Sequence, residues 1–321
     1  MWKNARDGIA LSIVGAIVVG GALLPTATFG QVANENIPLT DYASVQDPPQ
    51  FDTVEQAVDA FKSAVNDGGF DQLAELLGLD PAKAKASQGA MDTFADIQAG
   101  VSEQVIVVDK GVDKIIEIGK MLWPLPFPLV KHDDGKWGFD TYAGLEEIAD
   151  RHVGENELQT IDTLKAYVDA QEDYASEDRD GDGVLEYAQK VVSSEGMKDG
   201  LYWPLEQGDG EESPAGPALA DGDALEKAKA GEGYHGYRYR ILTGQGDNIA
   251  GGKYDYVING NMIAGHAIVA WPVQYGITGV KTFLVNKNGI IYEADLGENT
   301  AQIASRIRTF NPNDEWDIVS D

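Results

Sequence analysis

The sequence predicts an α+β protein of two domains, each with helices and an antiparallel sheet. Helical periodicity dominates residues 51–100 and returns after residue 150, whereas β-branched, alternating segments fill the stretch between and the last third of the chain. The length of 321 residues and the 43% hydrophobic fraction are enough for two ordinary cores. We expect an N-terminal domain at 51–150 and a C-terminal domain at 151–321.

The first thirty residues are expected to be a secretory signal peptide. A short basic stretch precedes the apolar run Ile9–Leu24, and small residues then place cleavage after Gly30, with Ala33 as the alternative site. An uncleaved anchor is the competing interpretation. Residues 31–50 are polar and proline-rich, which is typical of a linker. We therefore expect a periplasmic or secreted protein that touches a membrane only through an uncleaved signal segment.

The net charge and the absence of cysteine exclude several classes of function. The formal net charge of -29 repels nucleic-acid phosphates and anionic lipid, so no nucleic-acid partner is expected. Divalent cations and basic protein partners are compatible with it. The chain has no cysteine, which excludes disulfides, a thiol nucleophile and thiolate zinc sites.

The N-terminal domain should begin with three helices. Thr53 and Gln56 form a capping box before the first helix, which ends at the Gly68–Gly69 pair. A second helix carries Phe70 and three leucines, and a third runs from about 82 to 100.

Two hairpins should follow these helices. "QVIVV" and "KIIEI" flank one turn, and the other hairpin turns at 133–135. The alternate residues Pro124, Pro126 and Pro128 remove the donors from one side of a strand, which predicts an edge strand. Helices followed by a curved antiparallel sheet resemble, in outline, the cone-shaped nuclear transport factor 2-like and cystatin-like folds.

The C-terminal domain should open with a long amphipathic helix, "GENELQTIDTLKAYVDAQEDYASED", from Gly154. An acidic turn and a Gly/Glu/Pro-rich loop at 207–233 come next, and the helix "ENTAQIASRIRTF" closes the domain. Between that loop and the closing helix lie five candidate strands, with a tight "NKNG" turn before the last of them: "YRYRILT", "KYDYVIN", "HAIVAWP", "KTFLVN" and "GIIYEAD".

Long stretches of the mature chain resemble an exported bacterial family known as domain of unknown function 2950. The matching segments include "FDTVEQAVDAF", "WPLPFPLVKHDDGKWGFDT", "EDYASEDRDGDGVLEYAQ", "YHGYRYRILTGQG" and "WPVQYGITGVKTFLVNKNGIIYEADLG". The resemblance covers most of the chain and implies no activity.

Residues 154–296 are also similar to the globular part of type IV pilins and type II secretion pseudopilins. The likeness lies in a spine helix, "NE…TLKAYVDAQEDY", that is followed by a loop region and then by "GYRYRILT" and the "KTFLVNKNGIIYEA" hairpin. It implies a long helix packed on an antiparallel sheet. The chain departs from that pattern because a separate domain precedes the spine helix.

The acidic turn matches the first half of a calcium loop. Its candidate ligands alternate along the chain, as the loop of a twelve-residue calcium site requires, and Gly183 allows the sharp bend. The twelfth position is a glutamine rather than a bidentate glutamate, so the loop should bind Ca²⁺ weakly, with a Kd of about 0.1–1 mM. A solvated acidic turn without metal is the alternative. The candidate ligands are Asp178, Asp180, Asp182, Val184, Glu186 and Gln189.

Aromatic and arginine side chains suggest a ligand groove where "DGLYWP" meets "YHGY". Alternation should place two tyrosines of "YHGYRYR" on one face of a strand and two arginines on the other. The arginines could grip a carboxylate or tie down acidic neighbours, and the aromatic rings could equally be core residues. The candidate ligand-binding residues are Tyr202, Trp203, Tyr237, Arg238 and Arg240.

No catalytic motif is present in the sequence. The four histidines, His132, His152, His235 and His266, have no metal-binding spacing, and no nucleophile elbow or phosphate loop occurs. We therefore expect a non-enzymatic envelope protein that binds a small ligand or an envelope protein, stabilised by calcium if the acidic loop is a site. The alternatives are a hydrolase with its site in the cone-like N-terminal domain or between the two domains, and a scaffold component allied to a pilus or secretion system.

Overall fold

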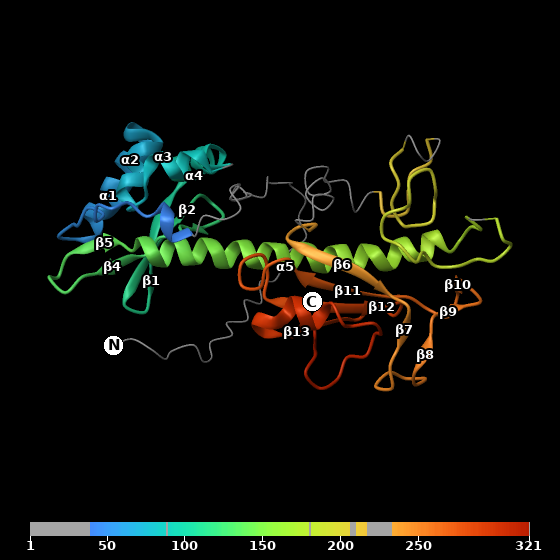
Figure 1. The fold of residues 1–321 in the computed structure, drawn as a ribbon. Coiled ribbons are helices and arrows are strands. Elements are labelled where there is room, and N and C mark those ends of the chain that lie inside the picture. Colours follow the sequence, from blue (N-terminus) through green and yellow to red (C-terminus); the bar gives the residue numbers. More distant parts are fainter. Residues whose placement is uncertain (1–38, 88, 180, 206–209, 217–232, 321) are drawn as a thin grey trace.

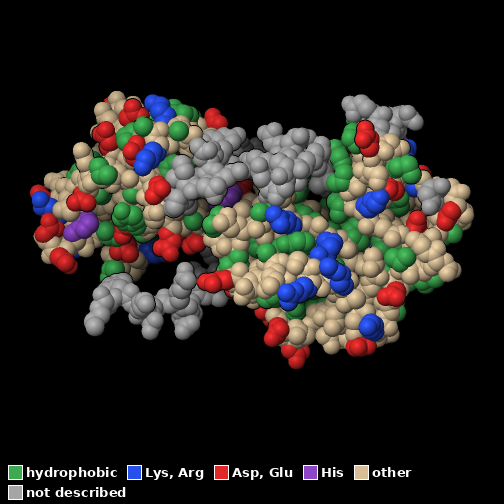
Figure 2. All heavy atoms as spheres, viewed as in Figure 1, with side chains coloured by type: hydrophobic (Ala, Val, Ile, Leu, Met, Phe, Trp, Pro, Cys, Tyr) green, Lys and Arg blue, Asp and Glu red, His purple; other side chains and the backbone are tan. Residues whose placement is uncertain are grey.

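The computed structural model describes residues 39–87, 89–179, 181–205, 210–216 and 233–320. The expected signal peptide and Asp180 lie outside these ranges. Within them, no helix combines the length and the hydrophobicity that crossing a membrane would require. The architecture is α+β, as the sequence predicts, and acidic side chains are spread over the visible face of the molecule (Figure 2).

Two units lie along one long helix, α5 (Thr141–Tyr174), as Figure 1 shows. The N-terminal unit, formed by the described residues up to 140, packs at the start of α5. The C-terminal unit, formed by the described residues after 174, lies along its second half. The sequence predicts this helix only from Gly154, but Asp140 caps the Ala143 N–H at 3.0 Å and starts it earlier. A glycine inside a helix costs only about 1 kcal/mol. Gly154 therefore does not interrupt α5, which continues through the expected domain boundary at residue 150.

The helices of the N-terminal unit lie on one side of its core. The predicted third helix is two helices, because Gly89 adopts a left-handed φ of 75° between them. The Thr53 hydroxyl accepts from the Gln56 N–H as expected, while the Gln56 side chain accepts from the Asp52 N–H, one residue before the cap. The helical segments are η1 (Leu39–Tyr42), α1 (Val54–Ser63), η2 (Ala64–Gly68), α2 (Gly69–Leu76), α3 (Pro81–Ala86) and α4 (Ala90–Glu103).

The N-terminal sheet contains both predicted hairpins, in the order β1-β2-β4-β5 with β3 paired to β2. The edge strand predicted through Pro124, Pro126 and Pro128 is confirmed only at Pro124, whose short strand β3 pairs with β2 alone among the described strands. Proline cannot donate to a ladder, so the chain forms two short strands, and the second of them lies between β2 and β5 rather than at an edge. The strands are β1 (Val105–Lys110), β2 (Asp113–Ile118), β3 (Trp123–Pro124), β4 (Leu129–Lys131) and β5 (Trp137–Phe139).

The described part of this sheet is not curled, so the expected cone-like form is not confirmed. Its strands have only two to six residues, and the proline segment interrupts its middle. A short, interrupted sheet lacks the length that curling around a helix needs.

The C-terminal sheet has the order β14-β13-β12-β11-β6, all antiparallel. "KYDYVIN" is the exception among the five candidate strands, because it forms two short strands outside this sheet. The closing helix is shorter than expected, with η3 (Gly297–Asn299) leading into α7 (Thr300–Ala304). The strands are β6 (Tyr237–Leu242), β7 (Gly244–Gln245), β8 (Tyr254–Asp255), β9 (Val257–Ile258), β10 (Asn261–Met262), β11 (Ala267–Pro272), β12 (Lys281–Asn286), β13 (Ile291–Asp295) and β14 (Asp317–Ile318).

Helix α5 covers one face of this sheet and α7 packs on the other. All six residues of β11 are buried, which suits a central strand covered on both faces. The Tyr167 hydroxyl of α5 donates to the Ala267 carbonyl at 3.1 Å, and the Glu157 carboxylate accepts from the Val280 and Lys281 N–H groups. Side-chain hydrogen bonds therefore fix the helix to the sheet in addition to apolar packing.

Candidate functional site

A pocket opens in the N-terminal unit, between its helices, the proline segment and the start of α5. It has a volume of about 160 Å³. Phe94, Leu125 and Phe127 form buried walls, and Phe70 and Trp123 are half-buried, so their rings connect the interior to the surface. Helix α5 contributes two more wall residues, Leu145 and Ile148.

The lining of the pocket is almost entirely hydrocarbon. The hydroxyl-bearing residues Tyr42, Ser87 and Thr93 are its polar members, and no charged residue lines it in the described part of the chain. A cavity of about 150 Å³ lined by Leu, Ile and Phe stays dry and binds benzene. Drug-sized ligands need about 300–1,000 Å³. The pocket therefore suits one small apolar group and not a large molecule.

Cations sit over the two aromatic rings at the mouth. The Lys85 ammonium lies 5.9 Å from the Phe70 centroid, and the Arg151 guanidinium lies 5.4 Å from the Trp123 centroid. Arg151 also donates to the Pro124 carbonyl at 2.9 Å. These contacts hold the rings at the edge of the opening and give the mouth a polar rim.

The predicted aromatic groove lies largely inside the C-terminal core. Trp203 is 2% exposed and Tyr237 is fully buried, both in the cluster between α5 and the sheet. Burial raises the pKa of Tyr237, whose hydroxyl donates to the Lys281 carbonyl at 2.9 Å. Tyr202 is half-buried, and its N–H donates to the Val191 carbonyl. The structure brings these rings together, as the sequence suggests, but it gives them packing roles.

The two arginines of β6 lie on the face of the sheet away from α5, as alternation predicts. Arg240 donates to the Ser305 carbonyl at 3.0 Å and to the Ala304 carbonyl at 2.8 Å, at the end of α7. Its guanidinium also lies 5.3 Å from the Trp271 centroid. Arg238 is exposed on the same face.

The acidic turn is held closed by its own carboxylates. The two oxygens of Asp178 accept from the N–H groups of Gly181 and Gly183 at 2.8 and 2.9 Å. Asp182 Oδ1 accepts from the Val184 N–H at 2.8 Å. Gly183 has the left-handed φ of 87° that the predicted bend requires.

The second half of the turn is tied to the β9–β10 hairpin instead. Glu186 accepts from the Met262 N–H at 2.9 Å, and the Gln189 side chain donates to the Gly260 carbonyl at 2.7 Å. The described residues contain no group of three side chains suited to a metal ion. Calcium at this turn therefore stays a prediction.

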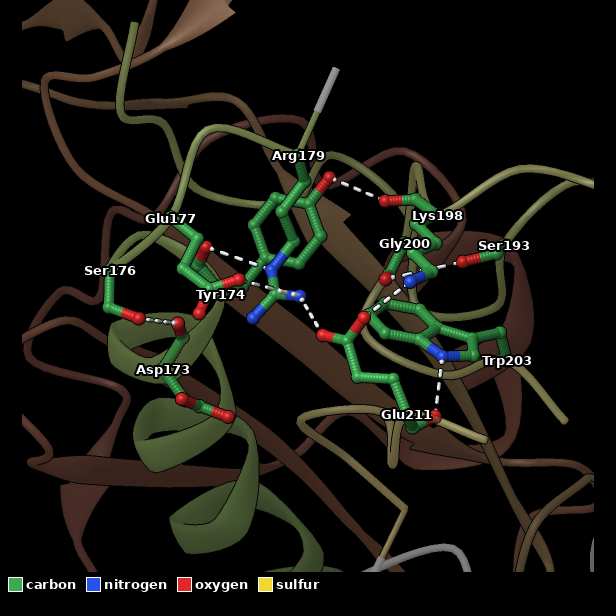
Figure 3. Close-up of polar contacts among 10 residues, drawn as sticks. All are labelled: Asp173, Tyr174, Ser176, Glu177, Arg179, Ser193, Lys198, Gly200, Trp203 and Glu211. Atoms are coloured by element: carbon green, nitrogen blue, oxygen red, sulfur yellow. Dashed lines mark hydrogen bonds and ion pairs between the residues drawn. The ribbon is translucent and has the colours of Figure 1, made fainter. Parts of the chain in front are cut away.

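An arginine that the sequence-based search missed holds the start of this turn (Figure 3). Arg179 has a side chain only 7% exposed, and its guanidinium lies between the rings of Tyr174 and Trp203, at 5.3 and 5.4 Å from their centroids. It donates to Glu211 at 2.9 Å, and the Lys198 ammonium contacts the same carboxylate. The hydrogen bonds from Lys198 and Arg179 lower the pKa of Glu211. The sequence signal for this contact is Arg179 itself, a single basic residue within the acidic turn.

The four histidines lie on four different parts of the chain: His132 in the β4–β5 turn, His152 on α5, His235 before β6 and His266 before β11. His266 is fully buried against the rings of Tyr167 and Tyr187. Burial lowers the pKa of His266 to about 4, with a further contribution from Lys287. The Glu172 carboxylate lies 3.8 Å away but is 60% exposed, so burial outweighs it and the ring stays neutral.

Sequence reasoning missed the pocket entirely. Its walls come from six segments between Tyr42 and Ile148, and each segment alone shows only ordinary core periodicity. No local pattern distinguishes a hydrophobic residue that lines a cavity from one that fills a core.

One comparison with known proteins identifies a family. A family model described as "Protein of unknown function (DUF2950)" matches residues 49–319. No curated protein and no solved structure matches the chain.

Proposed function

Because the chain belongs to the DUF2950 family of proteins of unknown function, we propose from its geometry that it is a non-enzymatic binding protein. Its N-terminal pocket takes one apolar group, either a small hydrocarbon or the apolar end of a larger amphiphile. The observation that carries this proposal is a cavity of about 160 Å³ with no charged lining residue and with two half-buried aromatic rings at its mouth.

Burial of a benzene-sized group in such a pocket is favoured by the hydrophobic effect. An apolar surface gains about 25 cal/mol for each Å² removed from water. The walls are preformed by buried Phe94, Leu125 and Phe127, so little ordering opposes binding. A hydrolytic site would need acid–base groups at the reacting atoms, and the pocket walls supply only hydroxyls. Binding therefore has more support here than the hydrolase alternative.

The test is toluene binding, followed by the unfolding midpoint and by tryptophan fluorescence, since Trp123 lines the mouth. Ala84→Phe fills the pocket from α3, whereas Ala86→Phe adds the same ring to an exposed position on the same helix. We expect saturable stabilisation of the wild type and of Ala86→Phe, and none of Ala84→Phe. Equal responses of the two variants would reject the pocket as the site. If Ala84→Phe does not fold, Ala90→Leu on α4 fills the same space from a half-buried position.

A scaffold role is the second candidate, and one observation favours it. A 34-residue helix packs on an antiparallel sheet, which is the arrangement that the resemblance to pilins implies. The corresponding test is affinity purification of the full chain from cross-linked cells. Enrichment of components of one envelope assembly would support the scaffold role, and recovery of the chain alone would count against it.

Export is also part of the proposal. It rests on the apolar run at Ile9–Leu24 and the small residues that follow it. The N-terminal sequence of the protein recovered from the periplasm or medium should begin after Gly30 or Ala33. Recovery of an intact N-terminus would instead support the anchor interpretation.

A further inference from the structure

Strand β1 has the sequence of a central strand but lies at an edge of its sheet. It pairs with β2 alone among the described strands. Its residues Val105–Val108 are all β-branched and apolar, which is typical of a strand that is covered on both faces. Val107 and Val108 are nevertheless 38% and 39% exposed, and the turn residue Val112 is 84% exposed. Figure 1 shows the tip of the β1–β2 hairpin projecting away from the helices of this unit.

The strands at the other ends of the two large sheets are protected against the addition of a further strand. Trp137 of β5 exchanges two backbone hydrogen bonds of 2.7 Å with Phe51, which covers that edge. Strand β14 has only two residues, and β6 carries Arg238 and Arg240. Coverage, short length and charge are the usual means by which proteins block a sheet edge. Strand β1 has none of these along its first four residues, since its first charged residue is Asp109.

The free side of β1 presents backbone groups that can pair with another strand. Residues on either side of a two-residue turn exchange both backbone hydrogen bonds, and such pairs recur at every second position. The turn here is Gly111–Val112, so Val107 and Asp109 direct their N–H and carbonyl groups away from β2. In agreement, Ile116, the partner of Val107, accepts from the Leu125 N–H at 2.8 Å on the opposite side of β2. Outside the hairpin, neither Val107 nor Asp109 makes a backbone–backbone hydrogen bond with the described residues.

We propose that the outer side of Val105–Lys110, called the β1 edge below, binds an extended segment of a basic protein partner by strand addition. Main-chain hydrogen bonds supply the affinity, and the exposed valines pack against apolar residues at alternate positions of the added strand. No residue of β1 lines the apolar pocket. The β1 edge is therefore a second site, which goes beyond the proposed function and does not depend on it.

The charge of the chain selects the partner. Two copies of this protein would each bring a formal charge of -29 to the contact, and a net charge far from zero keeps molecules apart. A segment rich in lysine or arginine is attracted instead. Asp109, whose side chain is 76% exposed, stands at the end of the apolar run, where it faces a residue of the added strand. Opposite charges at such cross-strand positions stabilise the pairing of strands.

The test is the binding of a labelled synthetic peptide to the full chain, measured by fluorescence anisotropy. The centre of the peptide alternates valine and threonine, and its ends are lysines. One control peptide carries methyl groups on alternate backbone nitrogens, which removes donors that a ladder needs. Another control peptide has glutamates in place of the lysines. We expect saturable binding of the lysine peptide and no saturable binding of either control.

The protein variant is Val107→Pro, which removes an outward N–H without taking a hydrogen bond from the β1–β2 ladder. Its control, Val107→Thr, keeps both the N–H and the β-branched shape. The lysine peptide should bind Val107→Pro about tenfold more weakly than the wild type, as expected for the loss of about one hydrogen bond together with obstruction by the ring. If Val107→Pro does not fold, Val107→Lys places a repelling charge at the edge. Its control is Val112→Lys, which adds the same charge at the exposed turn.

Three results would overturn the proposal. Equal binding of the lysine peptide to the wild type and to Val107→Pro would reject the β1 edge as the site, and equal binding of the lysine and methylated peptides would reject strand addition. Equal binding of the lysine and glutamate peptides would reject a basic partner. Sedimentation of the protein alone tests the second copy: a monomer supports the proposal, whereas a dimer that Val107→Pro dissociates would assign the edge to self-association.

Discussion

The two units on α5 differ in how completely their cores are filled. In the C-terminal unit, the central strand β11 is buried along its whole length, and helices cover both faces of the sheet. In the N-terminal unit, the sheet is short and interrupted by prolines, and a cavity of about 160 Å³ remains between it and the helices. A regular sheet fills space efficiently, whereas short irregular elements leave room. The difference places the continuous, two-sided core in the C-terminal unit and the open space in the N-terminal unit.

Core truncation in each unit tests this contrast with the largest expected effect. Phe283→Ala, at a fully buried position on β12, should lower the free energy of unfolding by about 3–5 kcal/mol. Phe70→Ala, at the half-buried mouth of the pocket, should cost about 1–2 kcal/mol, because that ring already lacks contacts on its pocket side. Urea unfolding measures both. Equal costs would show that the N-terminal core is as tightly packed as the C-terminal one.

Acid should weaken the C-terminal unit through His266. Its pKa is lowered to about 4 in the folded protein from an ordinary 6.5, so the unfolded chain binds the proton first. Stability from this group is complete above pH 6.5 and is lost as the pH falls towards 4, by about 3 kcal/mol in total. His266→Phe keeps a ring against Tyr167 and Tyr187 and should flatten the difference between pH 7 and pH 4.5. A variant whose pH dependence equals that of the wild type would contradict this role.

Removal of the arginine clamp, which is the set of contacts that Arg179 makes with Tyr174, Trp203 and Glu211, should have an intermediate effect on stability. Arg179→Met retains much of the packing between Tyr174 and Trp203 but loses the bonds to Glu211, for a cost of about 2 kcal/mol. The expected loss is below that of a fully buried pair because Glu211 is 43% exposed. Arg179→Lys should restore part of the loss. Urea midpoints for the three proteins decide the point, and unchanged stability of Arg179→Met would show that the clamp is dispensable.

Calcium should give the smallest effect, if the acidic turn binds it. With a Kd near 1 mM, about 5 mM calcium stabilises the folded state by roughly 1 kcal/mol. The unfolding midpoint should rise with calcium relative to chelator, and Asp180→Ala or Asp182→Ala should abolish the rise. Magnesium at the same concentration controls for ionic strength. The same midpoint in calcium and in chelator would leave the turn as a hydrogen-bonded loop closed by Asp178 and Asp182.

The sequence predicts well those features that depend on neighbouring residues. The β1–β2, β4–β5 and β12–β13 hairpins were predictable because turn residues and alternation lie within a few positions of each other. The opposite orientation of the tyrosines and arginines in β6 follows from the same two-residue period. The early start of α5 is not predicted because its signal is one capping residue, Asp140, that directly follows the second predicted hairpin.

The candidate sites were predicted less well. The aromatic residues Trp203 and Tyr237 were recognised as a cluster, but whether such a cluster is open or buried depends on α5, which covers it. Arg238 and Arg240 were identified, whereas Arg306 and Arg308 were seen only as parts of a helix. Arg240 donates to the carbonyls of Ser305 and Ile307, which lie more than 60 positions further along the chain, and no local sequence pattern predicts such a contact.

By itself the sequence determines the α+β class, the family, the acidic charge and the local hairpins, because composition and short periodicities are properties of the chain. The tertiary structure alone decides that α5 serves both units, that a cavity remains among the N-terminal helices, and that Arg240 and Arg308 meet at the end of α7. The cavity and the local charge at these places depend on segments that are distant in the sequence, so they arise only when those segments pack together.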